Sequence, residues 1–222
     1  MIQGTELGAF IENEIHPSVA AVQKLVRELS AVDYSLVIAR SEETPAAAAR
    51  LLALVKDSSE FGAARQETLE LRTEVDSEWR QNAARSTALM REVTGFEFGQ
   101  DTYRVFVTHP SMRNGAYFGN QEIAWGGMNE WPNYRTVYLW HEILHDEKWL
   151  GTGELNHAVL ELVADNELRV RLNGGEYPPW EGHPSLTPIR ERILPQWREY
   201  LASPGKDLRA FLAKVSDQEG KT

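Results

Sequence analysis

Cysteine is missing from this chain, although it has 222 residues. That absence excludes a disulfide scaffold, a zinc site built on thiolates and a cysteine nucleophile. Apolar runs of membrane-spanning length are missing too, and the N-terminus has no basic region followed by an apolar core and a cleavage site. We therefore expect a cytoplasmic protein with no membrane partner.

Positive charge is also scarce. Lys and Arg number 23 against 33 Asp and Glu, the net charge is −10, and no stripe of Lys and Arg stands out. Because phosphate binding needs concentrated positive charge, we expect no nucleic-acid partner. The 42% hydrophobic content is enough for one or two packed domains. Nothing in the sequence indicates the oligomeric state.

The most informative motif is the HExxH pentapeptide that begins at His141. On a helix, His141 and His145 are one turn apart, so both imidazoles project from one face towards a single metal ion. Glu142 lies about 100° round the helix axis and can reach a water beside that metal. Apolar residues surround the motif, so the helix is expected to be buried, with Pro132 in its first turn. Zn²⁺ suits these ligands, and a catalytic zinc needs a third one.

Glu161 is the best candidate for that third ligand. It lies in a segment, residues 156–173, whose apolar spacing predicts a second helix, with Gly174 as its C-terminal cap. Asp165 is four residues further on and shares the face of Glu161. Its carboxylate is expected to accept the free ring N–H of a liganding histidine and so orient that ring.

HExxH followed by ExxxD resembles the gluzincin clan of zinc metallopeptidases. The resemblance covers roughly residues 100–175. It implies zinc ligands at His141, His145 and Glu161, a general base at Glu142, and an orienting carboxylate at Asp165. It also implies an edge strand above the metal that pairs with extended substrate.

Two details qualify this resemblance. The stretch 114–117 resembles the clan's edge-strand signature with a glycine inserted, and it reads equally well as an ordinary hairpin turn. The metzincin extension is absent, because Lys148 and Gly151 stand where it needs glycine and histidine.

Three further side chains are candidates for the site. His157 lies one turn before Glu161 and is an alternative third ligand, a donor beside the reacting carbonyl, or simply a histidine at a helix start packed near the site. Tyr177 and His183 follow the glutamate helix in or beside a proline-rich loop, where a group that stabilises the transition state could lie.

The remaining patterns predict a mostly α fold with a small β-sheet (α+β). Strands are expected at 103–108, 116–118 and 122–125. We expect a helical N-terminal region (1–95), a zincin-like core (96–185) and C-terminal helices packing on the core (186–222).

These features predict a zinc-dependent metallopeptidase that acts on a peptide or protein substrate. A second hypothesis is a non-catalytic binding or scaffold protein of the same fold with a structural or vestigial metal site. A third is an all-helical protein in which the motif has arisen by chance.

Overall fold

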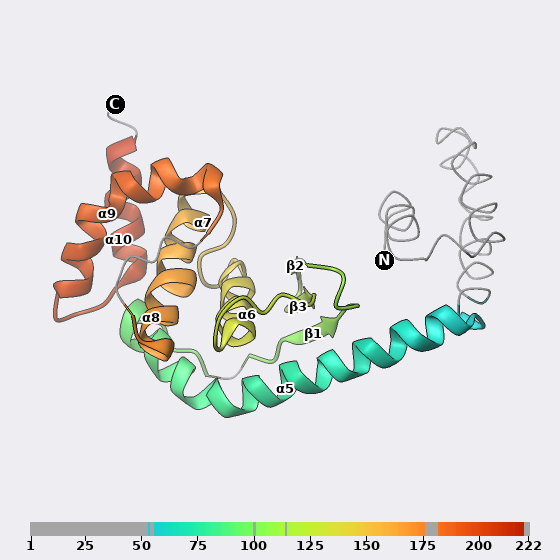
Figure 1. Cartoon of the computed structure of the whole chain (residues 1–222). Helices are drawn as coiled ribbons and strands as arrows, with labels where there is room; N and C mark the ends of the chain where they lie inside the picture. Colours follow the sequence, from blue (N-terminus) through green and yellow to red (C-terminus); the bar gives the residue numbers. More distant parts are fainter. Residues whose placement is uncertain (1–52, 54–55, 100, 114, 176–181, 220–222) are drawn as a thin grey trace, which may run out of the picture. The chain divides into compact units, whose positions relative to one another are not determined.

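The fold is mostly helical with one small sheet, as the sequence predicts (Figure 1). The computed structural model describes residues 53, 56–99, 101–113, 115–175 and 182–219. The helices expected before residue 53 lie outside this range, as does Tyr177. The chain divides between Leu69 and Glu70 into two compact units, and the candidate site lies within the second, residues 70–222.

The helices follow the predicted order, with differences at the start of α6 and within the helix predicted over 156–173. Their bounds are α5 (Ser59–Thr94), α6 (Tyr134–Leu144), α7 (Glu154–Glu161), a π-helical segment (Leu162–Leu168), α8 (Arg169–Asn173), a 3-10 turn (Pro184–Leu186), α9 (Thr187–Ala202) and α10 (Leu208–Glu219). The single helix predicted over 156–173 is thus interrupted by seven residues of π-helix. No helix in the described part of the chain has both the length and the apolar character of a bilayer span.

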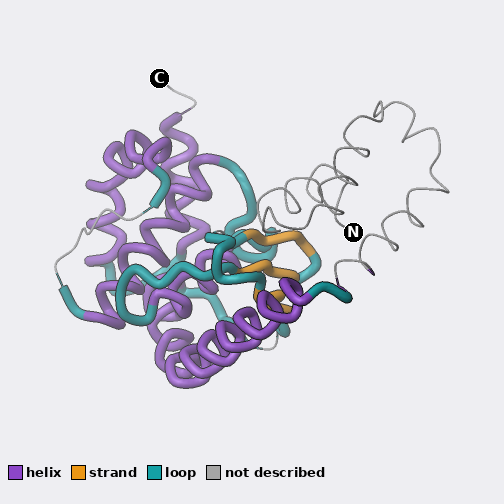
Figure 2. The backbone as a smooth tube through the Cα atoms, turned by 45° about the vertical axis from the view of Figure 1, so that its right-hand side comes forward, coloured by secondary structure: helices purple, strands orange, loops and turns teal. Residues whose placement is uncertain are grey.

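All three predicted strands are present, and they form one mixed sheet (Figure 2). β1 (Arg104–Val107) is parallel to β3 (Glu122–Trp125), which is antiparallel to β2 (Ala116–Gly119). Asn120 and Gln121 join β2 to β3 with positive φ angles of 50° and 61°, as in tight hairpin turns. The order β1-β3-β2 leaves β2 at one edge of the sheet.

One hydrophobic core joins these elements. α6 packs against α7 and the π-helical segment (Figure 1), and the core runs from Leu71 in α5 to Val215 in α10. Both predicted segment boundaries, near residues 95 and 185, fall within this unit. The C-terminal helices pack on the core, through Ile193 and Trp197 of α9 among others.

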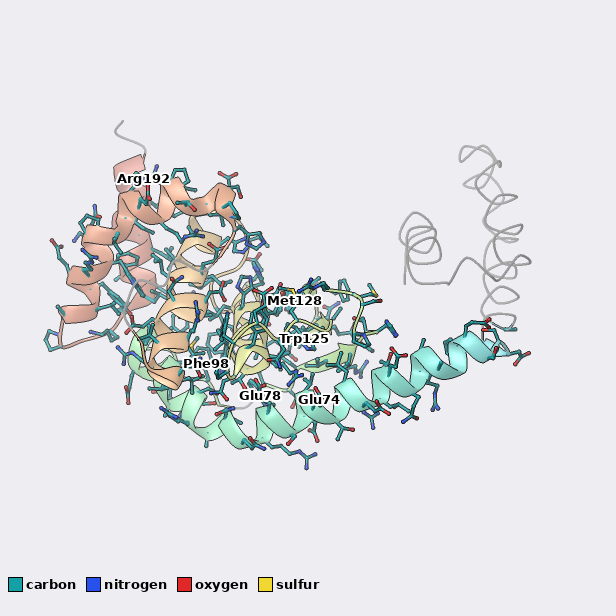
Figure 3. The ribbon with its side chains drawn as sticks, in the orientation of Figure 1. Glu74, Glu78, Phe98, Trp125, Met128 and Arg192 are labelled. Carbon is teal, nitrogen blue, oxygen red and sulfur yellow. The ribbon has the colours of Figure 1, made fainter. Side chains whose placement is uncertain are left out.

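The start of α6 depends on a side chain from α5. The helix begins at Tyr134, so the prediction that Pro132 lies in its first turn is wrong. Asn133 before it has a left-handed backbone (φ 58°), and its side chain does not cap the helix. Glu78 supplies the acceptor instead. Its Oε1 accepts from Thr136 N (2.8 Å) and Thr136 Oγ1 (3.1 Å) (Figure 3). A carboxylate at a helix N-terminus also interacts favourably with the helix dipole.

We expect Glu78→Ala to lower the free energy of unfolding by about 1–2 kcal/mol, the usual effect of losing a helix N-terminal acceptor. Glu74→Ala is the matched control. Glu74 is on the same helix and pairs with Arg135, but its side chain is 58% exposed against 14% for Glu78. Because the Glu74 carboxylate is largely in solvent, its pair with Arg135 is expected to contribute only about 0–1 kcal/mol. Urea unfolding followed by circular dichroism measures both, and equal losses would contradict the capping role.

Candidate metal centre

Helix α6 brings the two motif histidines together. The Nε2 atoms of His141 and His145 face each other at 3.3 Å, and their rings are inclined at 67°. His141 is buried, with 3% of its surface exposed. In a tetrahedral zinc site with Zn–N bonds of about 2.0–2.1 Å, two imidazole nitrogens stand about 3.3 Å apart. The predicted histidine pair is therefore already at the separation that one ion requires.

The other ring nitrogen of each histidine is hydrogen-bonded away from this meeting point. Nδ1 of His141 lies 2.9 Å from Oδ2 of Asp165, the predicted orienting contact. The ring of His145 bonds the backbone of Gly151, and Nδ1 is the nitrogen available for it, because Nε2 faces His141. With both Nδ1 atoms donating outward, the two neutral rings direct lone pairs at each other. A cation between them removes that repulsion.

A third histidine completes this group. The ligand atoms of His141, His145 and His157 all lie within 4.8 Å of one another. Nε2 of His157 is buried and has no hydrogen-bond partner among the described residues. A buried polar atom without a partner lowers stability, so this nitrogen is suited to bind an ion. The three histidines could therefore hold a metal ion.

Glu161 lies beside this group but faces other partners. It forms a second cluster of ligand atoms with His157 and His183. Its Oε1 accepts from the backbone N and from Nδ1 of His183, both at 2.6 Å, and its Oε2 pairs with Arg190. A Cβ at Gly182, where φ is 126°, would overlap this carboxylate, so the loop approaches Glu161 closely only because residue 182 is glycine.

The π-helical segment (Leu162–Leu168) begins directly after Glu161 and contains Asp165. Nδ2 of Asn166 donates to the backbone carbonyl of Glu161 at 2.8 Å, five residues earlier. Such wide turns often occur at functional sites, because they change which side chains share a helix face. Here the segment carries Asp165, which reaches back to His141 on α6.

Glu142 is buried next to the histidines, with 3% of its surface exposed. The backbone N–H of Tyr117 on β2 and the hydroxyl of Tyr138 both bond its carboxylate. Burial nevertheless raises the pKa of Glu142, because the attraction of His141 and these two bonds only partly offset the loss of solvation. A Cβ at Gly115 would lie 3.0 Å from Oε1 of Glu142 and closer still to Tyr138. The chain leading into β2 therefore passes directly over the carboxylate.

The structure gathers most of the predicted site in one place. Six of the predicted side chains lie close together: His141, His145, His157, Glu161, Asp165 and His183. Glu142 adjoins them on α6. Tyr177 lies outside the described residues, and its predicted role remains a prediction. The sequence analysis missed Arg190. It shares the buried face of α9 with Ile193, Trp197 and Tyr200, and a charged residue at such a position signals a buried partner.

Comparisons with protein-family models, with curated proteins and with solved structures gave no match.

The histidines differ in their affinity for protons. Burial and the neighbouring His141 lower the pKa of His145 to about 4, and burial with the surrounding imidazoles lowers that of His157 to about 3. His141 behaves in the opposite way. Burial lowers its pKa, but the charge of Asp165 and the hydrogen bond to it outweigh burial, and the net shift is upward from 6.5. The metal-free site therefore holds its first proton on His141, between the two Nε2 atoms.

We expect NMR of the metal-free protein to show this difference directly. At pH 5.5 an unperturbed histidine, with a pKa near 6.5, is mostly protonated. The ring ¹⁵N shifts of His145 and His157 should still be those of neutral imidazole at that pH, whereas His141 should be an imidazolium. Titration of all three rings together near pH 6.5 would show that the rings do not share a buried site.

Proposed function

We propose that the protein is a zinc-dependent metallopeptidase. The observation that carries the proposal is the pair of histidine Nε2 atoms 3.3 Å apart, with Glu142 buried beside them. His141 and His145 would hold the ion together with a side chain of α7, either His157 or Glu161. Zinc is favoured because neutral imidazole and carboxylate are ligands that suit it.

A bound Zn²⁺ supplies an acidified water and a polarised carbonyl. Glu142 acts as the general base, and its carboxylate takes a proton from the attacking water and passes it to the leaving amine. The burial of Glu142 supports this role. Burial raises the pKa of its carboxyl group, and a carboxylate with a raised pKa is a better proton acceptor. His183, whose Nδ1 lies 2.6 Å from Oε1 of Glu161, is the candidate for stabilising the negative charge that develops on the substrate. In that role its ring acts as an imidazolium that donates through Nε2, because Nδ1 donates to Glu161.

Strand β2 is the proposed docking edge for a peptide substrate. It pairs with β3 on one side, and within the described residues no strand pairs with its other side. An extended peptide can add to such an edge through main-chain hydrogen bonds. The edge adjoins the reaction centre, because Tyr117 of β2 bonds Glu142. Phe118 on the same strand is 64% exposed and offers apolar contact to a substrate side chain.

Glu142→Gln tests the mechanism. Glutamine has nearly the same shape but is not a base, so we expect unchanged zinc content and a loss of about 100-fold to 10,000-fold in turnover. The measurement is cleavage of a quenched fluorescent peptide library by zinc-loaded protein, with zinc quantified by mass spectrometry in the same samples. His145→Ala is the contrasting variant, because it should lose zinc as well as cleavage.

Undiminished cleavage by the Glu142→Gln protein would show that Glu142 is not the base. Treatment with a chelator should abolish cleavage by the parent, and added zinc should restore it. Stoichiometric zinc without cleavage of any peptide would instead support the scaffold hypothesis.

A further inference from the structure

His157 joins two clusters of potential ligand atoms. One contains His141 and His145, and the other contains Glu161 and His183. A metal between the motif histidines therefore has two candidate third ligands on α7, one turn apart. The structure distinguishes them by what each side chain already contacts.

Glu161 has no free oxygen. Oε1 accepts two bonds from His183, and Oε2 pairs with Arg190. The Glu161 and Arg190 side chains are 0% and 2% exposed, so this is a fully buried ion pair. Removing the carboxylate from Arg190 would leave an uncompensated charge in the core, which is strongly unfavourable. Arg190 also donates to neutral acceptors, His183 O at 3.2 Å and Thr187 Oγ1 at 2.9 Å.

His157 has the opposite character. Its buried Nε2 has no hydrogen-bond partner in the described part of the chain, and it lies 3.7 Å from Glu161 Oε1, too far for a hydrogen bond. Its ring stands nearly perpendicular to those of His141 (75°, 5.2 Å between centroids) and His145 (82°, 4.7 Å). One ligand atom from each of these three histidines lies within 4.8 Å of the other two, so the three rings could share one ion.

We propose that Arg190 is a positioning residue that keeps Glu161 off the metal, so that the protein ligands are His141, His145 and His157. Glu161 then holds His183 beside the site by two hydrogen bonds. The inference depends on the metal binding proposed above and specifies its ligands. Three neutral imidazoles would leave the charge of a divalent ion at +2, whereas one carboxylate ligand would reduce the net charge to +1. The ion held by three histidines would therefore be a stronger Lewis acid than one held by two histidines and Glu161.

Zinc affinity, measured by competition with a chromophoric chelator, separates the two ligand sets. We expect His157→Ala to weaken zinc binding by at least about 100-fold. Glu161→Gln should weaken it by less than about 10-fold, because residue 161 is not a ligand in this arrangement and its amide oxygen can still accept from either Arg190 or His183. The reverse order, with Glu161→Gln the more damaging change, would overturn the inference.

Zinc X-ray absorption of the full chain gives a readout that a merely structural role would not change. The parent and Glu161→Gln proteins should give the same spectrum, that of zinc bound by three imidazoles and one oxygen ligand that does not come from residue 161. A spectrum with two imidazoles and a carboxylate, altered by Glu161→Gln, would contradict the proposal.

A double variant, Glu161→Gln with Arg190→Met, covers the case in which the single change prevents folding. It removes both buried charges at once, and it should bind zinc within about 10-fold of the parent. Loss of zinc from the folded double variant, with folding verified by circular dichroism, would overturn the inference. If the parent itself binds no zinc, the metallopeptidase proposal fails. If the parent binds zinc through Glu161, only the ligand assignment fails.

Discussion

The candidate metal centre depends on two imidazole nitrogens that face each other. Nε2 of His141 and Nε2 of His145 are 3.3 Å apart. Each ring is turned into this position by an outward bond from its other nitrogen, to Asp165 and to Gly151. Neutral histidines in this arrangement repel each other, and the apolar core around α6 offers little water to relieve that repulsion. A divalent cation turns the same geometry into a binding site, and in its absence a single proton can occupy the position.

The surrounding elements hold this arrangement in place. Glu78 of α5 caps α6 at Thr136 and so fixes where the helix begins. The sheet places β2 against Glu142, and the passage over the carboxylate requires the small residue Gly115. Arg190 of α9 reaches Glu161 on α7 and links the C-terminal helices to the site. The helices that form the hydrophobic core, α6 and α7, therefore also carry the polar side chains of the candidate site.

Much of this could be predicted from the sequence. HExxH spacing and apolar flanks predict α6, and residue alternation predicts the three strands. The four-residue spacing of Glu161 and Asp165 predicts a bond from Asp165 to one of the liganding histidines, and the structure contains it at His141. The π-helical turn and the pairing of Glu161 could not be predicted, because both depend on tertiary partners. Arg190 is 29 residues from Glu161 along the chain, and only its place on the buried face of α9 gives a sign of the pairing.

Anomalous diffraction from zinc-loaded crystals, measured on both sides of the zinc absorption edge, tests the central claim most directly. The account predicts one anomalous peak between α6 and α7, at bonding distance, about 2.0–2.1 Å, from Nε2 of both His141 and His145. A zinc-saturated crystal whose anomalous peaks all lie elsewhere, with the two Nε2 atoms still 3.3 Å apart and unbridged, would contradict it.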